Sequence, residues 1–111
     1  TCDVVDAMVS DLGDALGTLK VDGGASVNDS LMQFQADMLD VVVRRPVVAE
    51  TTALGAAYLA GLAVGVWDSL EDIASNWVLD KEFSADCSAQ LRQERQSRWH
   101  KAVSRSLDWE G

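Results

Sequence analysis

The segment from Ala53 to Trp67 is the strongest constraint that this sequence places on its own fold. It is almost entirely apolar, and small residues recur in it at every fourth position: Ala53, Ala57, Gly61 and Gly65. This spacing places them in one narrow column along an α-helix, with larger apolar residues in the columns beside it. A helix that is apolar nearly all round is expected to be buried. The pattern therefore predicts a buried helix over residues 52–64, packed closely on a sheet.

The same segment is too short to cross a membrane. A bilayer needs about 20 consecutive apolar residues, whereas this run is shorter and contains three glycines and a tyrosine. No other stretch is long and apolar enough, so the sequence predicts no membrane span. No basic segment followed by an apolar run opens the chain, so we expect no secretory signal either.

The charge of the chain narrows the classes of partner. Nine Lys and Arg residues stand against 18 Asp and Glu residues, which gives a formal net charge of −9 and a pI near 4.3. Binding to nucleic acid requires a basic surface that displaces counterions. The acidity therefore argues against nucleic acid as a partner, and against electrostatic attachment to a membrane.

The cysteine and histidine content predicts neither a disulfide framework nor a metal site. Cys2 and Cys87 lie far apart in the sequence, which favours two reduced thiols and a cytoplasmic location. The single histidine, His100, has no cysteine or second histidine near it in the sequence, so we assign no metal ligand.

Hydrophobic periodicity predicts helices that alternate with short strands. The predicted elements are, in order, a helix over 1–12 that Gly13 ends, a strand over 19–21, a helix over 30–39, a strand over 41–43, the helix over 52–64, a short helix from residue 69, an extended segment over 78–83, and a C-terminal helix over 88–108. This order is typical of an α/β fold with neighbouring parallel strands. Two or three strands are few for a complete sheet and the chain has no initiator Met, so we expect a piece of a longer protein.

Three local expectations follow from residue type. Pro46 should prevent a central strand from continuing regularly through it. Thr51 or Thr52 is expected to cap the helix that follows. The last helix should turn its apolar residues inward and its basic residues outward, the apolar set being Leu91, Trp99, Ala102, Val103 and Leu107.

The motif that carries chemistry is Asp22-Gly23-Gly24-Ala25, within a strand–turn–helix unit over residues 19–39. Glycine can adopt positive φ, and its missing Cβ lets a ligand approach the backbone. The start of the following helix offers unpaired N–H groups to an anion. A phosphate or nucleotide is the natural ligand, and a plain turn between strand and helix is the equal alternative. The motif is neither a Walker A loop nor the dinucleotide-binding fingerprint.

Two polar residues accompany this motif, and each has two interpretations. Asn28 could hydrogen-bond to a base or ribose, or it could cap the helix that follows. Asp22 could lie near a metal, or it could accept N–H bonds from the turn. No pair of carboxylates stands out as acid and base, and no Ser–His–Asp set exists. Phosphoryl transfer needs a base and cationic groups, so we assign no catalytic residue within this chain.

The residues from Val21 to Ala25, followed by Asn28 and the run 31–37, resemble the C-terminal half of the glycerol kinases, which belong to the FGGY carbohydrate kinases. The resemblance extends over essentially the whole chain. Its other parts are Arg45-Pro46, the specific block 50–67, Glu82-Phe83, Trp99, Lys101-Ala102-Val103 and Trp109.

The resemblance implies a partial ribonuclease H-like, actin-like ATPase fold, in which residues 1–111 form the C-terminal part of the second kinase domain. Members of this family bind ATP and Mg²⁺ in the cleft between two domains. They transfer the γ-phosphoryl group to glycerol, giving sn-glycerol 3-phosphate. We also expect a cytoplasmic location and a homo-oligomer. The family's catalytic base and glycerol-binding residues lie in upstream segments, so this chain alone is expected to be inactive.

Two nucleotide contacts carry over from the resemblance: Gly24 through its backbone, and Asn28 near the adenine. Gly23 and Asp22 complete the predicted cofactor-binding set. Asp29 departs from the family, which often has Asn or Lys there, and it adds a negative charge beside the nucleotide. Two alternatives stay open, namely another FGGY sugar kinase and a stand-alone acidic binding module.

Overall fold

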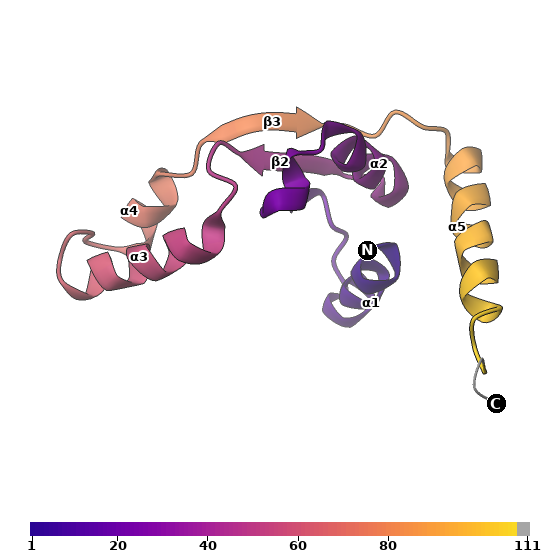
Figure 1. Cartoon of the computed structure of the whole chain (residues 1–111), viewed down its shortest axis with the longest axis horizontal. Helices are drawn as coiled ribbons and strands as arrows, with labels where there is room; N and C mark the ends of the chain where they lie inside the picture. The colour runs from indigo at the N-terminus through magenta and orange to yellow at the C-terminus, as the bar shows by residue number, and fades with distance from the viewer. Residues whose placement is uncertain (109–111) are drawn as a thin grey trace.

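A computed structural model of the chain, which describes residues 1–108, shows helices arranged around a small three-stranded sheet (Figure 1). The elements are α1 (Cys2–Leu12), β1 (Thr18–Lys20), the 3-10 helix η1 (Gly24–Val27), α2 (Asp29–Leu39), β2 (Val42–Pro46), α3 (Thr51–Ala63), α4 (Leu70–Ser75), β3 (Leu79–Phe83) and α5 (Ala89–Ser104). The predicted α/β alternation is confirmed. Trp109 lies outside the described residues. Within them, no helix is long and apolar enough to cross a membrane.

The sheet has β2 at its centre. β1 pairs with β2 in parallel, with Leu19 opposite Val43, and α2 connects these two strands along the chain. The predicted parallel neighbours are therefore confirmed. β3 pairs with the other edge of β2 in the antiparallel direction, with Phe83 opposite Val43.

Among residues 1–108, one small cluster of buried residues holds the sheet and α2 together. Its members are each at most 7% exposed: Met32, Ala36, Val41, Val43 and Phe83. Leu31, Phe34, Gln35 and Met38 share one face of α2, and this face lies toward α1 and α5 instead of the sheet. The side chains of α2 that face the sheet are Met32 and Ala36, which no periodicity in the sequence indicated.

The strand β2 runs on to Pro46, beyond the predicted strand over 41–43. The register shifts between Arg45 and Pro46, where β2 pairs with β3. Because proline has no N–H to donate, a regular ladder cannot continue through it. The prediction that Pro46 interrupts the regular pairing is right, although the strand still includes this residue.

The prediction that the apolar helix is buried is wrong for the described chain. No residue of α3 is buried, and Figure 1 shows α3 and α4 extending away from the sheet at one end of the molecule. The radius of gyration is 17.9 Å, whereas a compact domain of this length has about 13 Å. The structure is therefore elongated, and the apolar surface of α3 faces outward.

One position in the small-residue column of α3 does make a close contact. A Cβ on Gly61 would lie 2.7 Å from Cδ1 of Trp67, so only glycine fits beneath this indole. The Trp67 ring also meets Tyr58 edge to face, with ring centroids 5.6 Å apart. The close approach that the small residues permit is thus made by a neighbouring side chain and not by the sheet.

The last helix is shorter and more polar in its contacts than predicted. α5 ends at Ser104, and none of its apolar residues is buried. It meets the C-terminal end of α2 through polar side chains: Arg92 Nε donates to the Asp37 carbonyl at 2.6 Å, and Gln96 Nε2 donates to the Met38 carbonyl at 3.2 Å. The last carbonyls of a helix have no partner within it, so hydrogen-bond donors are what suits this end of α2.

Candidate functional site

The glycine turn lies directly after β1, and its two glycines do different things. Gly23 has φ 79° and ψ 171°, a backbone conformation that favours glycine. Its N–H donates to the Ala49 carbonyl at 2.7 Å. At Gly24 a Cβ would meet nothing within 4 Å. The first glycine is therefore needed for the shape of the turn, and the second leaves open space beside the backbone.

The turn is closed by its own hydrogen bonds. The Ser26 hydroxyl donates to the Gly23 carbonyl at 2.7 Å, and the Ser26 N–H donates to the same oxygen at 3.0 Å. Ser26 is 1% exposed and is the one buried polar residue among those described. The N–H groups of Gly24 and Ala25 donate to no protein acceptor within residues 1–108. The fold thus presents a preformed turn with two unpaired donors.

The turn meets a second loop at the same edge of the sheet. β1 and β2 are parallel, so the segments that follow them both leave at the carboxyl ends of the strands, where open α/β sheets bind ligands. Besides the bond from Gly23 to Ala49, the Thr51 hydroxyl donates to the Asp22 carboxylate. Asp22 therefore accepts from a side chain on the other loop, and not from the N–H groups of its own turn as one interpretation predicted.

The expectation that Thr51 or Thr52 caps α3 is wrong. The N-cap residue is Glu50, and its side chain makes no capping bond. Thr51 is the first residue of the helix, and its hydroxyl is used for Asp22. Sequence spacing could not indicate this contact, because Asp22 follows β1 and Thr51 begins α3, 29 positions later.

Asn28 caps α2, as one of its two interpretations predicted. Its side-chain oxygen accepts from the Leu31 N–H at 3.1 Å, and the residue is exposed. The carboxamide nitrogen of Asn28 donates to no acceptor among the described residues. The cap therefore leaves this nitrogen accessible, and the predicted contact with a nucleotide stays a prediction.

The negative charge of Asp29 is offset by two cations. Lys81 Nζ lies 2.6 Å from one carboxylate oxygen, and Arg45 Nη1 lies 2.8 Å from the other. The hydrogen bonds from Lys81 and then from Arg45 lower the pKa of Asp29 below its ordinary value. Asp29 stands where the family often has Asn or Lys. Because two cations offset its carboxylate, Asp29 adds less negative charge beside the turn than its sequence position suggested.

Arg45 is the residue that sequence analysis missed. Its side chain is only 11% exposed, and its guanidinium also reaches the Ser26 carbonyl at 2.9 Å and Asp80 at 2.8 Å. Hydrogen bonds to Asp29 and then to Asp80 raise the pKa of Arg45. Arg45 thereby ties the glycine turn to β2 and β3. Its signals in the sequence were its place beside a run of β-branched residues and its membership of the Arg45-Pro46 pair that carries part of the family resemblance.

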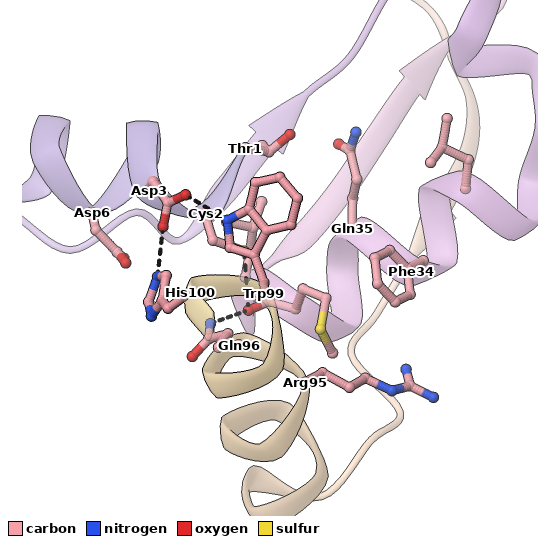
Figure 2. A pocket seen from close by; sticks show the side chains of 13 residues that line it. Thr1, Cys2, Asp3, Asp6, Phe34, Gln35, Arg95, Gln96, Trp99 and His100 are labelled. Carbon is pink, nitrogen blue, oxygen red and sulfur yellow. Dashed lines mark hydrogen bonds and ion pairs between the residues drawn. The ribbon is translucent and has the colours of Figure 1, made fainter. Parts of the chain in front are cut away.

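A separate cavity of about 290 Å³ lies between α1, α2 and α5 (Figure 2). In it Asp3 accepts from Trp99 Nε1 at 2.8 Å and pairs with His100 Nε2 at 2.9 Å. These bonds, the one from Trp99 first, lower the pKa of Asp3. None of the predicted site residues lines this cavity. Within residues 1–108, no group of three or more His, Cys, Asp or Glu side chains is placed to hold a metal ion.

Comparison with known proteins extends over the whole chain. Residues 1–64 match the model of the C-terminal domain of the FGGY family of carbohydrate kinases. The chain is 58% identical to glycerol kinase 1 of Clostridium tetani and 59% identical to glycerol kinase 2 of Thermotoga maritima. Each alignment covers 99% of this chain but 22% of the relative. The chain thus spans about a fifth of the length of the curated relatives that it matches.

A solved structure agrees with the fold. The crystal structure of Plasmodium falciparum glycerol kinase with ADP matches at a TM-score of 0.77 and 39% identity, over 94% of this chain and 21% of that one. The resemblance that the residues indicated is confirmed by these matches.

Proposed function

Because the chain belongs to the FGGY family of carbohydrate kinases, we propose that it forms the nucleotide-side part of a glycerol kinase, within the second domain of an actin-like ATPase fold. The parent kinase, as we name the longer enzyme, transfers the γ-phosphoryl group of ATP to glycerol and gives sn-glycerol 3-phosphate. The observation that carries the proposal is the preformed turn at Gly23 and Gly24, with its open side and unpaired N–H groups. The similarity to a glycerol kinase solved with ADP supports it.

In this proposal the turn binds ATP or ADP through its backbone. The N–H groups of Gly24 and Ala25 donate to the nucleotide, and the absence of a side chain on Gly24 lets the nucleotide lie against the chain. The free carboxamide nitrogen of Asn28 donates toward the adenine. Gly23 holds the turn in its shape through its positive φ and its bond to Ala49, and the Asp22 carboxylate beside it is bonded to Thr51.

The remaining chemistry is assigned to other parts of the parent kinase. ATP supplies the phosphoryl group, and the base and the glycerol-binding residues are expected outside this chain. The 111 residues alone are therefore expected to show no turnover. Among the described residues, no three His, Cys, Asp or Glu side chains lie together as metal ligands, and we assign Mg²⁺ no residue and no step here. The cytoplasmic location and a homo-oligomeric state are parts of the same proposal.

Another FGGY sugar kinase is the second candidate. The run from Thr52 to Gly61, TALGAAYLAG, favours glycerol as the substrate class, and so do the glycerol kinase relatives. Comparing glycerol with other polyols and sugars as substrates of the parent kinase separates these two candidates.

The decisive experiment places a side chain on the open side of the turn. In the parent kinase, Gly24→Val is expected to weaken ATP binding about tenfold or more, which corresponds to about 1.4 kcal/mol, because the valine occupies the space that the nucleotide needs. Calorimetric titration with ATP measures the affinity.

Gly17→Val is the matched control for this experiment. A Cβ at Gly17 also meets nothing within 4 Å, and neither glycine has positive φ, but Gly17 precedes β1 and lies outside the turn. The control should bind ATP like the unmodified enzyme. Equal ATP affinity in Gly24→Val and the unmodified enzyme would overturn the proposed site.

A further inference from the structure

We infer that Thr51 is a positioning residue for the glycine turn, and that it acts by holding the Asp22 carboxylate away from the N–H groups of the turn. The inference rests on the proposed function of that turn. Its starting point is the hydrogen bond from the Thr51 hydroxyl to Asp22, which joins the first residue of α3 to the residue directly before Gly23.

The hydroxyl of Thr51 is available for this contact because it has no role in capping the helix. The N-cap position belongs to Glu50, so the Thr51 hydroxyl is free to donate a hydrogen bond to the Asp22 carboxylate. A hydrogen bond from a hydroxyl to a charged carboxylate is roughly twice as strong as one between neutral groups. Among the described residues, Thr51 is the one hydrogen-bond partner of the Asp22 side chain.

The position of Asp22 explains why its carboxylate must be held. An aspartate side chain readily accepts from the backbone N–H two residues further along the chain, and for Asp22 that N–H belongs to Gly24. If Thr51 released the carboxylate, it could bind the N–H group that we propose for the nucleotide. It would also bring a negative charge beside the phosphates. Thr51 therefore keeps the turn open to an anionic ligand.

The two segments are already fixed to each other around this contact. The Gly23 N–H bonds to the Ala49 carbonyl at 2.7 Å, and on the far side of the turn Arg45 Nη1 donates to the Ser26 carbonyl at 2.9 Å. Removing the hydroxyl of Thr51 should thus free the Asp22 side chain without displacing the backbone of the turn. The expected effect is on nucleotide affinity and not on folding.

The test compares variants of the parent kinase that differ in one hydroxyl. Thr51→Val keeps the shape of threonine, and Thr51→Ala suits a helix better. Each should raise the Kd for ATP about tenfold, because ATP would then have to displace the Asp22 carboxylate from the Gly24 N–H, at the cost of one hydrogen bond to a charged group. Thr51→Ser keeps the hydroxyl and should restore the affinity. Thr52→Val is the matched control, because Thr52 is exposed and its side chain makes no described hydrogen bond.

A double-mutant cycle tests the role of Asp22 directly. In an Asp22→Ala background the carboxylate is gone, so Thr51→Val should cause no further loss of ATP affinity. The KM for ATP should rise with the Kd, while the KM for glycerol and the melting temperature stay at the values of the Thr52→Val control. An equal loss in both backgrounds, or a loss that Thr51→Ser does not restore, would overturn the inference.

The outcome also separates this inference from the proposed function. If Gly24→Val weakens ATP binding and Thr51→Val does not, the turn binds the nucleotide and Thr51 has no positioning role. If neither substitution changes ATP binding, the proposed nucleotide site itself is wrong, and the inference is overturned with it.

Discussion

Asn28 is the residue at which two roles of one side chain can be separated. Its oxygen caps α2 by accepting from Leu31, while its nitrogen is free for the proposed contact with the adenine. Serine can cap a helix as well as asparagine can, but it has no carboxamide. Asn28→Ser therefore removes one role and keeps the other, whereas Asn28→Ala removes both.

We expect Asn28→Ser in the parent kinase to weaken ATP binding while the stability stays unchanged. Asn28→Ala should weaken ATP binding equally and also lower the free energy of unfolding by about 1 kcal/mol, the usual cost of losing a cap. Calorimetric titration and urea unfolding measure the two effects. Unchanged ATP affinity in both variants would leave Asn28 with the cap alone.

At the scale of elements, the residues Asp29, Arg45 and Lys81 connect α2, β2 and β3. The pKa of Asp29 is lower in the folded chain than its ordinary value of 3.8. The ionised carboxylate therefore stabilises the fold above that ordinary pKa, and the contribution is lost as the pH falls through the lowered, folded-state pKa. Asp29 and Lys81 are both about half exposed to solvent, so the effect should be small.

We expect the free energy of unfolding to fall between about pH 5 and pH 3 more steeply in the unmodified protein than in Asp29→Asn. Urea unfolding at several pH values in this range measures the difference. Asp14→Asn is the control, because Asp14 makes no described ion pair. Equal slopes for Asp29→Asn and the unmodified protein would show that these pairs do not contribute.

The helices and strands that could be predicted are those whose sequence signal comes from neighbouring residues in the chain. Gly13 adopts the left-handed conformation that ends α1, and the run of valines before Arg44 supplies Val43, a fully buried residue of the central strand. The direction of β3 and the exposure of α3 could not be predicted, because pairing and burial depend on what packs against an element. Hydropathy reports how apolar a helix is and not what covers it.

One part of the candidate site could likewise be predicted from the sequence, and another part could not. Its glycine turn could be found because glycine and aspartate between a strand and a helix are a local signal. The contacts that hold the turn, from Arg45 to Ser26 and from Thr51 to Asp22, join segments 19 and 29 positions apart. No periodicity links such positions, so only the folded structure brings them together.

At the scale of the whole molecule, the exposed apolar surface of α3 has a consequence for association. Large apolar patches on a soluble chain favour contact with other molecules, and Leu59 on α3 is 65% exposed. We expect the 111-residue chain alone to self-associate as its concentration rises. Light scattering after size exclusion measures its mass.

Leu59→Glu should shift this self-association to higher concentration, because it places a charge on the apolar surface of α3. Gln90→Glu introduces the same change of charge on α5, at an exposed polar position, and serves as the control. A monomer at all concentrations, or an equal effect of both substitutions, would rule out α3 as the associating surface.

The buried cluster has a consequence for how the chain opens. Four of its five members come from residues 32–43, and only Phe83 comes from later in the chain. The free energy of local unfolding ranges from near zero at the weakly packed ends of a protein to the free energy of global unfolding in its core. The ends of this molecule therefore open far more often than its centre does. The glycine turn, bonded to β2 through Arg45, belongs to the part that stays closed longest, so a ligand would find it formed even while the outer helices fluctuate.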